Sequence, residues 1–290
     1  MILNIRSWNL NFLYERYKKP DEKARNNKLP AERDYWISVG KKVIQKEKEN
    51  DYNSESIRFW MLQESSLVLY EDHFLHKEYY LYEENESILK DSGIRYLDNS
   101  HNGRIPFGYG LIIESENTKC NICNRNPAFL DKGECTKGAL SLNYKLNNQE
   151  IITLINIHTQ KKNIFGIDYS KEYFKTLDEY IIPFVKKIKN ENNDHLIILG
   201  GDFNMNRNYW DSDSFKVYDG KKLFEIIENE LGFYDCTKKL PEDKRSTMID
   251  YDQQNDYIFI NREIKYEIKI YPYEDEEFTD HKIVELKLEI

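Results

Sequence analysis

The sequence of 290 residues is 40% hydrophobic and 32% charged, with a formal net charge of −9. These proportions are typical of a globular protein with a packed core, and they exclude a disordered chain. The negative charge argues against a dedicated binder of double-stranded DNA, which needs a basic face to neutralise phosphates. It does not argue against an enzyme that brings its own metal cation.

The N-terminus shows no targeting segment. Its residues, MILNIRSWNLN, lead directly into strand-like sequence without the basic and apolar regions of a signal peptide. No apolar run along the chain reaches the roughly 20 residues that a bilayer-spanning helix needs. We therefore expect a cytoplasmic protein without a membrane anchor.

Strand-like segments recur along the chain and are rich in β-branched and aromatic residues. They cover residues 2–10, 59–65, 109–115, 139–145, 151–159, 195–203, 256–261 and 282–290. Helical patterns with one apolar face lie at 32–50, 171–190 and 221–233, and Gly232 is placed to cap the last of them. Strands near both ends of the chain, mixed with long helices, predict an α/β protein built in layers. Because no repeat or Pro/Gly/Ser-rich linker interrupts the sequence, we predict a single domain spanning residues 1–290.

Four cysteines leave three alternatives open. Cys120, Cys123 and Cys135 lie close together in a run that begins with a C-x2-C spacing, whereas Cys236 is far along the chain. A structural zinc site needs four ligands, and Cys236 is a doubtful fourth. A zinc site, a local disulfide and free thiols are therefore all compatible with the sequence.

Polar residues stand where the predicted strands end or begin. Each one alone has an ordinary explanation as a turn residue, a solvated strand end or a buried histidine. If neighbouring strands end at one edge of a sheet, however, these side chains converge. The carboxylate and amide oxygens among them suit a hard cation such as Mg²⁺, and the histidines can handle protons. This set is what metal-assisted attack of water on a phosphate ester requires. Its members are Asn9, Asn11, Glu64, His158, Asp202, Asn204, Asp256, Asp280 and His281.

The order of the motifs SWN, QE, NIH, GDFN, NDY and TDH resembles the endonuclease/exonuclease/phosphatase superfamily, which includes pancreatic-type DNase and exonuclease III. The resemblance extends from about Asn4 to Leu288, and GDFN with QE upstream and DH near the C-terminus is a specific combination. It implies a four-layer α/β sandwich in which two mixed, mostly antiparallel β-sheets pack face to face with helices outside. It also implies an active site at one edge of the sheets.

On the metal side, the resemblance implies that Glu64 is the principal Mg²⁺ ligand, with Mn²⁺ as a substitute. Asn9 would lie beside it, and Asp280 resembles the second acidic residue that the superfamily has near the metal. Some repair-type members have an aspartate two residues after the first-strand asparagine. Here Asn11 occupies that position, which weakens the expectation of a second metal at that place.

On the water and phosphate side, the resemblance implies that Asp202 orients or deprotonates the attacking water. Asn204 would help to hold that water and a phosphate oxygen. His281 would contact the phosphate, and Asp256 would fix the tautomer of its ring and support its charge. His158 resembles the histidine of DNase-like and phosphatase-like branches, whereas repair enzymes tend to have an amide there.

The superfamily fold does not fix the substrate, so charge near the expected catalytic edge has to guide the choice. Residues 15–28 contain six Lys or Arg and three Asp or Glu, and they follow the first strand. An acidic run at 273–278 opposes this basic rim, and Lys/Glu-rich loops can be simple solvated surface. The residues that we expect to contact substrate are Asn11, Lys137, Lys161 and Arg207, with Lys162 next to them.

We therefore favour a Mg²⁺-dependent phosphodiesterase, and within this class a DNase-like nuclease. Its expected partner is a nucleic acid, DNA in particular, as substrate, and we infer no obligate protein partner. One alternative is a phosphatase or phosphodiesterase acting on phosphoinositides, sphingomyelin-type lipids or small nucleotides. No apolar hairpin for docking to a membrane is evident, which counts against lipids. A second alternative is a catalytically inactive binding module that kept the fold.

Overall fold

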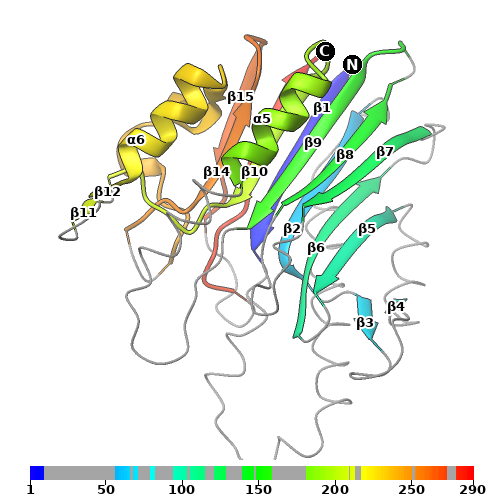
Figure 1. Ribbon diagram of the computed structural model, residues 1–290, viewed down its shortest axis with the longest axis horizontal. Coiled ribbons are helices and arrows are strands. Elements are labelled where there is room, and N and C mark those ends of the chain that lie inside the picture. The colour runs from blue at the N-terminus through cyan, green and yellow to red at the C-terminus, as the bar shows by residue number, and fades with distance from the viewer. Residues whose placement is uncertain are drawn as a thin grey trace, which may run out of the picture.

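The computed structural model describes two β-sheets and the helices that cover one of them (Figure 1). The residues that it describes are 1–9, 56–65, 68–70, 79–81, 94–102, 105–114, 121–128, 139–146, 148–158, 181–208, 210–212, 217–249, 252–272 and 279–290.

The first sheet has six strands in the order β15-β16-β1-β2-β6-β5. Its strands are β1 (Ile2–Asn9), β2 (Ser56–Ser65), β5 (Ile94–Asn102), β6 (Ile105–Glu114), β15 (Tyr266–Ile270) and β16 (Val284–Glu289). β1 and β2 are parallel, and the other neighbours are antiparallel. The N-terminal and C-terminal strands are therefore central neighbours in one sheet.

The second sheet also has six strands, in the order β13-β14-β10-β9-β8-β7. They are β7 (Asn121–Ala128), β8 (Ala139–Lys145), β9 (Ile151–His158), β10 (Leu196–Asp202), β13 (Tyr234–Asp235) and β14 (Asp256–Ile260). Only β9 and β10 run parallel. Two small ribbons pair β3 (Val68–Tyr70) with β4 (Tyr79–Leu81) and β11 (Trp210–Ser212) with β12 (Val217–Asp219).

The two large sheets pack face to face, and alternate residues of their strands fill the space between them. Odd-numbered residues of β1 and β2 meet even-numbered residues of β9, β10 and β14. This alternation follows from the period of two along a strand. The buried residues of this inter-sheet core are Leu3, Ile5, Ile57, Phe59, Met61, Leu146, Ile152, Leu154, Leu196, Ile198, Cys236, Ile258, Ile260, Val284, Leu286 and Leu288.

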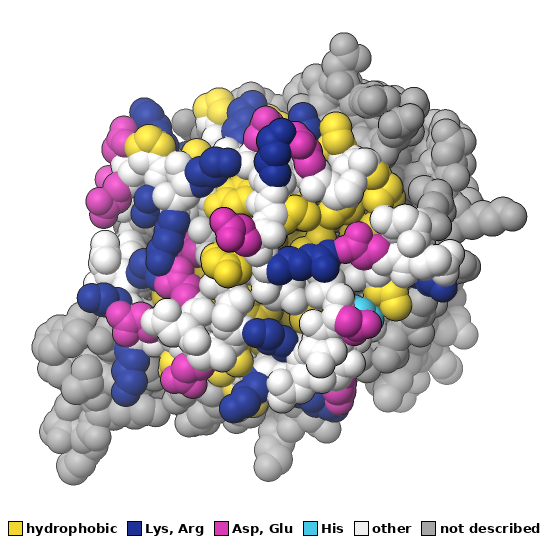
Figure 2. All heavy atoms as spheres, turned by 90° about the horizontal axis from the view of Figure 1, so that it is seen from above, with side chains coloured by type: hydrophobic (Ala, Val, Ile, Leu, Met, Phe, Trp, Pro, Cys, Tyr) yellow, Lys and Arg dark blue, Asp and Glu magenta, His cyan; other side chains and the backbone are white. Residues whose placement is uncertain are grey.

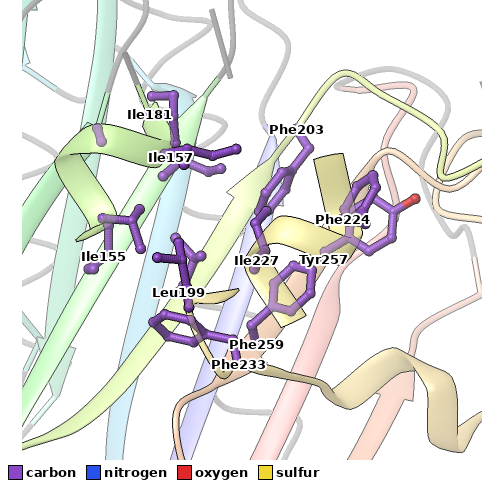
Figure 3. Packing of buried hydrophobic residues seen from close by; sticks show 14 of the residues in the cluster. Ile155, Ile157, Ile181, Leu199, Phe203, Phe224, Ile227, Phe233, Tyr257 and Phe259 are labelled. Atoms are coloured by element: carbon purple, nitrogen blue, oxygen red, sulfur yellow. The ribbon is translucent and has the colours of Figure 1, made fainter. Parts of the chain in front are cut away.

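Helices cover the outer face of the second sheet. α5 (Ile182–Glu191) packs Val185 and Ile188 against it, and α6 (Gly220–Glu225) continues into a π-helical turn at Ile226–Glu230. Two 3₁₀ turns follow at Cys236–Lys239 and Glu242–Lys244. Rings from three segments meet in this layer, as Figure 3 shows, and they belong to Phe203, Phe224, Tyr257 and Phe259.

The predicted fold class is confirmed, because two mixed and mostly antiparallel sheets face each other with helices outside the second one. Gly232 ends the helical segment with a φ of 65°, as its predicted role as a cap requires. The helix expected at 32–50 lies outside the described residues, and so does much of the one expected at 171–190. The single-domain organisation stays a prediction. None of the helices in the described ranges combines the length and hydrophobicity that crossing a bilayer requires.

Cys236 has a free, fully buried thiol in the inter-sheet core. It directly follows β13, at one edge of the second sheet, whereas Cys123 lies in β7 at the other edge. Five strand spacings separate these edges, which amounts to roughly 20 Å or more. Cys236 therefore cannot share a zinc site with Cys123. Cys120, Cys135 and the side chain of Cys123 lie outside the described residues.

Candidate active site

The candidate site is the polar end of the inter-sheet core. Along β1 and β9 the inward-facing residues change from apolar to polar as the strands approach one edge. Leu3 and Ile5 are followed by Asn9, and Ile152 and Leu154 are followed by His158. β10 ends at the same edge, and the antiparallel β14 begins there, so its first residue joins the group. The arrowheads of β1 and β9 mark this edge in Figure 1, at the end of the sandwich away from the two termini.

Register places three ionisable residues side by side. Asp202 pairs with His158 across the parallel strands and with Asp256 across the antiparallel ones. The tight pairing with β9 requires a glycine just before Asp202. Gly201 has a φ of 134°, and a Cβ atom there would overlap the carbonyl of Ile157.

Asp202 is held by neutral amide groups. The side-chain amide of Asn9 donates to Oδ2 over 2.8 Å, and that of Asn204 donates to the same oxygen over 2.9 Å. The backbone N–H of Asn204 donates to Oδ1 over 2.6 Å. Asn204 has a φ of 47°, a left-handed conformation that asparagine tolerates better than most residues. These three donor groups are uncharged. They therefore fix the orientation of the buried carboxylate without adding a positive charge beside it.

Two imidazoles face this carboxylate. Nε2 of His158 lies 3.5 Å and Nε2 of His281 lies 3.9 Å from Oδ2 of Asp202. The other ring nitrogen of His281, Nδ1, lies 2.9 Å from Oδ2 of Asp256, and its Nε2 lies 3.6 Å from Oδ1 of Asp280. The bond to Asp256 requires a proton on Nδ1, so it fixes the ring orientation and its tautomer.

Electrostatics favour a charged His281. Burial alone would lower its pKa, but the carboxylates of Asp256, Asp202 and Asp280 outweigh this effect and raise the pKa to about 10. Burial raises the pKa of Asp256, and the positive charge of His281 opposes that shift. His281 therefore brings a positive charge to an otherwise acidic cluster.

Threonine hydroxyls tie the segments of the site together. Oγ1 of Thr279 donates to the carbonyl of Asn9 over 2.6 Å and accepts from the backbone N–H of His281 over 3.0 Å. Oγ1 of Thr247 accepts from the backbone N–H groups of Asn255 and Asp256. Neither threonine was predicted as a site residue. Thr279 is the first residue of the TDH motif, whereas no pattern in the sequence marks Thr247.

The acidic cluster has the donor atoms for a metal ion. Asp202, Asp256 and His281 present ligand atoms within 4.8 Å of one another, a spacing at which they could bind a metal. The bond between Asp256 and His281 favours a proton on that imidazole instead, and metal ligation requires the neutral ring. Asp202, the member of this group that takes no part in that bond, offers carboxylate oxygens of the kind that hard divalent cations prefer.

The structure brings together seven of the expected site residues, which are Asn9, His158, Asp202, Asn204, Asp256, Asp280 and His281. Glu64 lies in β2, one residue beyond the strand position that pairs with Asn9, and its side chain is outside the described part of the chain. Asn11, Lys137, Lys161, Lys162 and the runs at 15–28 and 273–278 also lie outside the described residues.

Arg207 is engaged with the protein itself. Its guanidinium binds Glu228 over 2.9 Å and Asp235 over 2.6 Å, and it stacks over the ring of Phe224 at 4.5 Å. Its backbone N–H donates to the hydroxyl of Tyr257. These contacts anchor the segment that follows β10. They occupy the guanidinium of Arg207, which is the group that the sequence predicted to contact the substrate.

Comparison with known proteins supports the fold at low sequence identity. No protein-family model matches the sequence, and no curated protein is significantly similar to it. Among solved structures, a humanized TDP2 of D. rerio aligns with a TM-score of 0.60 at 14% identity, over 100% of this chain and 99% of its own. The catalytic domain of human Nocturnin, with bound sulfate, aligns with a TM-score of 0.59 at 12% identity, over 99% and 94%. An endonuclease/exonuclease/phosphatase family protein of Bacteroides thetaiotaomicron aligns with a TM-score of 0.57 at 14% identity, over 99% and 97%. The chain therefore has the endonuclease/exonuclease/phosphatase fold.

Proposed function

We propose that this protein is a divalent-metal-dependent phosphodiesterase that hydrolyses phosphate esters with an activated water, and that its substrate is a nucleic acid. The observation that carries the proposal is the geometry around Asp202. A buried carboxylate is oriented by two asparagines and faces two imidazoles at one end of a β-sandwich. This arrangement supplies a base for water and a cation for phosphate in one place.

Asp202 is suited to accept the proton of the attacking water. The amides of Asn9 and Asn204 orient its carboxylate but cannot protonate it. As the water oxygen bonds to phosphorus, its proton would pass to Asp202, while the bond between phosphorus and the ester oxygen breaks and the leaving oxygen takes up a proton from solvent water. Nε2 of His281, whose ring Asp256 holds, would donate a charge-assisted hydrogen bond to a phosphate oxygen.

A bound metal would be held by Glu64, with Asn9 and Asp280 nearby, and would stabilise the negative charge that develops on the phosphate. The oxygen-rich set of side chains supports Mg²⁺, with Mn²⁺ as a substitute. His158 would complete the site on the side of β9, where its Nε2 faces Asp202.

DNA is the substrate class that we favour. One solved structure with the same fold, with a TM-score of 0.57, is D. rerio TDP2 in complex with a single-strand DNA product. The excess of basic residues at 15–28 supports the same choice, because it places positive charge after β1, whose end forms the site. Arg207 would contribute by anchoring the segment after Asn204, and Asn11, Lys137 and Lys161 would contact the substrate.

The direct test uses supercoiled plasmid, a fluorescent single-stranded oligonucleotide and an RNA of the same length, each with Mg²⁺, Mn²⁺ or EDTA. We expect metal-dependent cleavage of DNA that EDTA abolishes. The isosteric change Asp202→Asn should lower the rate by about 10²- to 10⁴-fold, because it removes the base. Asp194→Asn is the matched control, since that side chain is 82% exposed beyond the opposite end of β10 and should leave the rate unchanged.

Two outcomes would contradict the proposal. Failure to cleave any nucleic acid with either metal would exclude a nuclease, and release of phosphate or a head group from inositol lipids, sphingomyelin or nucleotides would then identify the other substrate class. Full activity of Asp202→Asn would exclude the proposed site itself.

A further inference from the structure

A buried polar layer lies between the apolar inter-sheet core and the candidate site. Ser7 of β1, Gln63 of β2 and Asn156 of β9 are all fully buried in it. Each precedes a proposed site residue by one or two positions, since Asn9 follows Ser7 and Glu64 follows Gln63, while His158 follows Asn156 by two. The layer therefore underlies the site on both sheets.

Gln63 is the centre of this layer. Its Nε2 donates to Oδ1 of Asn156 over 2.6 Å, to the carbonyl of Met61 over 3.0 Å and to Oγ of Ser7 over 3.2 Å. In return, Nδ2 of Asn156 donates to the carbonyl of Leu62 over 2.9 Å. Two side chains thus connect β2 of the first sheet to β9 of the second by reciprocal hydrogen bonds.

The orientation of the Gln63 amide follows from its neighbours. The carbonyl of Met61 and Oδ1 of Asn156 are both acceptors, so only the NH₂ group can face them. Its Oε1 is buried and has no hydrogen-bond partner among the described residues. An unsatisfied buried oxygen costs about 1–3 kcal/mol, which offsets part of the stability that the donor bonds of Gln63 contribute.

The backbone of β2 is irregular at the same place. Its pairing with β6 shifts register between Leu62 and Ser65, where three steps along β2 correspond to two along β6. Such a β-bulge changes the alternation of side chains and is frequent beside active sites. Gln63 and Glu64 are the two residues within it. The amide of Gln63, tied to Met61 before the bulge and to Asn156 across the sandwich, fixes the point at which the strand departs from regular geometry.

We propose that Gln63 is a positioning residue that sets the separation of the two sheets at the site, so that the end of β2, which carries Glu64, lies at the right distance from Asp202 and His158 on the other sheet. The inference rests on the proposed function, because it assigns Gln63 to the alignment of that site. Gln63 acts through its neighbours and does not itself touch the reacting atoms.

The test compares Gln63→Met with Thr153→Val. The methionine keeps the length of the side chain but removes the donor. Thr153 is fully buried like Gln63 and lies on β9, the strand of Asn156, but its hydroxyl bonds Asn143 and His195 on the outer side of the sheet, away from the site. Both variants lose a buried hydrogen bond, and both should lower Tm. Only Gln63→Met should lower kcat on bis(p-nitrophenyl) phosphate with Mn²⁺, by about 10- to 100-fold, with KM within about 3-fold of wild type.

A second measurement is independent of turnover. Binding of Mn²⁺, followed by electron paramagnetic resonance, should weaken by about 10-fold in Gln63→Met and stay at the wild-type value in Thr153→Val. Asn156→Ala should reproduce both effects, and it carries the test if Gln63→Met does not fold. The double variant should be no slower than the slower single one, because both changes break the same connection.

The outcomes separate the two claims. If wild type binds Mn²⁺ and hydrolyses the diester while Gln63→Met and Asn156→Ala lose only stability, as Thr153→Val does, Gln63 is structural and the proposed function stands. If wild type hydrolyses no diester and binds no Mn²⁺, the proposed function fails, and the role of Gln63 fails with it.

Discussion

At the scale of single residues, the candidate site depends on which partners hold each ionisable group. Asp202 accepts hydrogen bonds from the neutral amides of Asn9 and Asn204, which fix the orientation of its carboxylate. His281 is held by a carboxylate and has further carboxylates within 4 Å of its other nitrogen, so it keeps its proton. These two side chains lie 3.9 Å apart, and in the proposed reaction Asp202 would accept a proton while His281 would donate a hydrogen bond to the phosphate.

This charge state makes a prediction about stability against pH. Folding raises the pKa of His281 from 6.5 to about 10, so its contribution to stability is complete below pH 6.5 and is lost as the pH rises through about 10. In EDTA, the Tm of wild type should therefore fall between about pH 6 and 10.5. The Tm of His281→Gln should fall much less over the same range, as calorimetry can measure.

The control for this prediction is His195→Gln, at the other end of β10. Its ring bonds the hydroxyl of Thr153 and has no contact with the acidic cluster among the described residues. It should keep the pH profile of wild type. Identical profiles for wild type and His281→Gln would show that the imidazole carries no extra proton in the folded state.

At the scale of elements, the sequence predicts the central strands well and the edges poorly. The inner strands β1, β9, β10 and β14 are apolar runs with buried faces, and their bounds match the expected ranges within two residues. β15 was not predicted, because it is an edge strand whose residues alternate between half-buried and exposed, with charged side chains on the open face. A short alternating run of this kind resembles a solvated loop in the sequence.

The site was predictable where strand ends carry the chemistry. Asn9, His158 and Asp202 each follow an apolar run, which is a signal in the sequence. Thr247 and Gln63 could not be recognised as parts of the site in the same way. Their importance comes from partners elsewhere in the sequence. Thr247 bonds the backbone of Asp256, and Gln63 bonds the side chain of Asn156. Only the packing of two sheets brings these partners together.

Arg207 gives a prediction at this scale, because it links three elements. It ties the segment after β10 to Glu228 in the π-helical turn and to Asp235 in β13. Arg207→Met should lower the free energy of unfolding by about 2 kcal/mol, since it removes the cation that pairs with Oδ2 of the nearly buried Asp235. The measurement is urea denaturation followed by circular dichroism.

Lys187→Met is the matched control, because it removes an exposed helical ion pair with Glu191 and should cost less than about 0.5 kcal/mol. Kinetics decide between the two roles considered for Arg207. If it contacted the substrate instead, Arg207→Met would raise KM for DNA and leave the unfolding free energy unchanged.

At the scale of the whole molecule, an acidic protein is proposed to bind a polyanion. Figure 2 views the edge of the sandwich opposite to the site, where Lys and Arg side chains are interspersed with Asp and Glu and neither sign dominates. The net charge of −9 would repel DNA at a distance, whereas the basic run at 15–28, which follows β1 in the sequence, would attract it locally. Screening by salt weakens both effects, so the sign of the salt dependence shows which one controls binding.

We expect the local attraction to dominate, because each basic side chain that contacts a phosphate releases a counterion. Between about 50 and 200 mM NaCl, KM for a single-stranded 20-mer should rise several-fold while kcat changes little. Bis(p-nitrophenyl) phosphate, which has a single phosphate, serves as the control, and its KM should stay nearly constant. A KM for the 20-mer that falls with salt would mean that overall repulsion prevails. In that case a small or weakly charged phosphodiester would fit the site better than a nucleic acid.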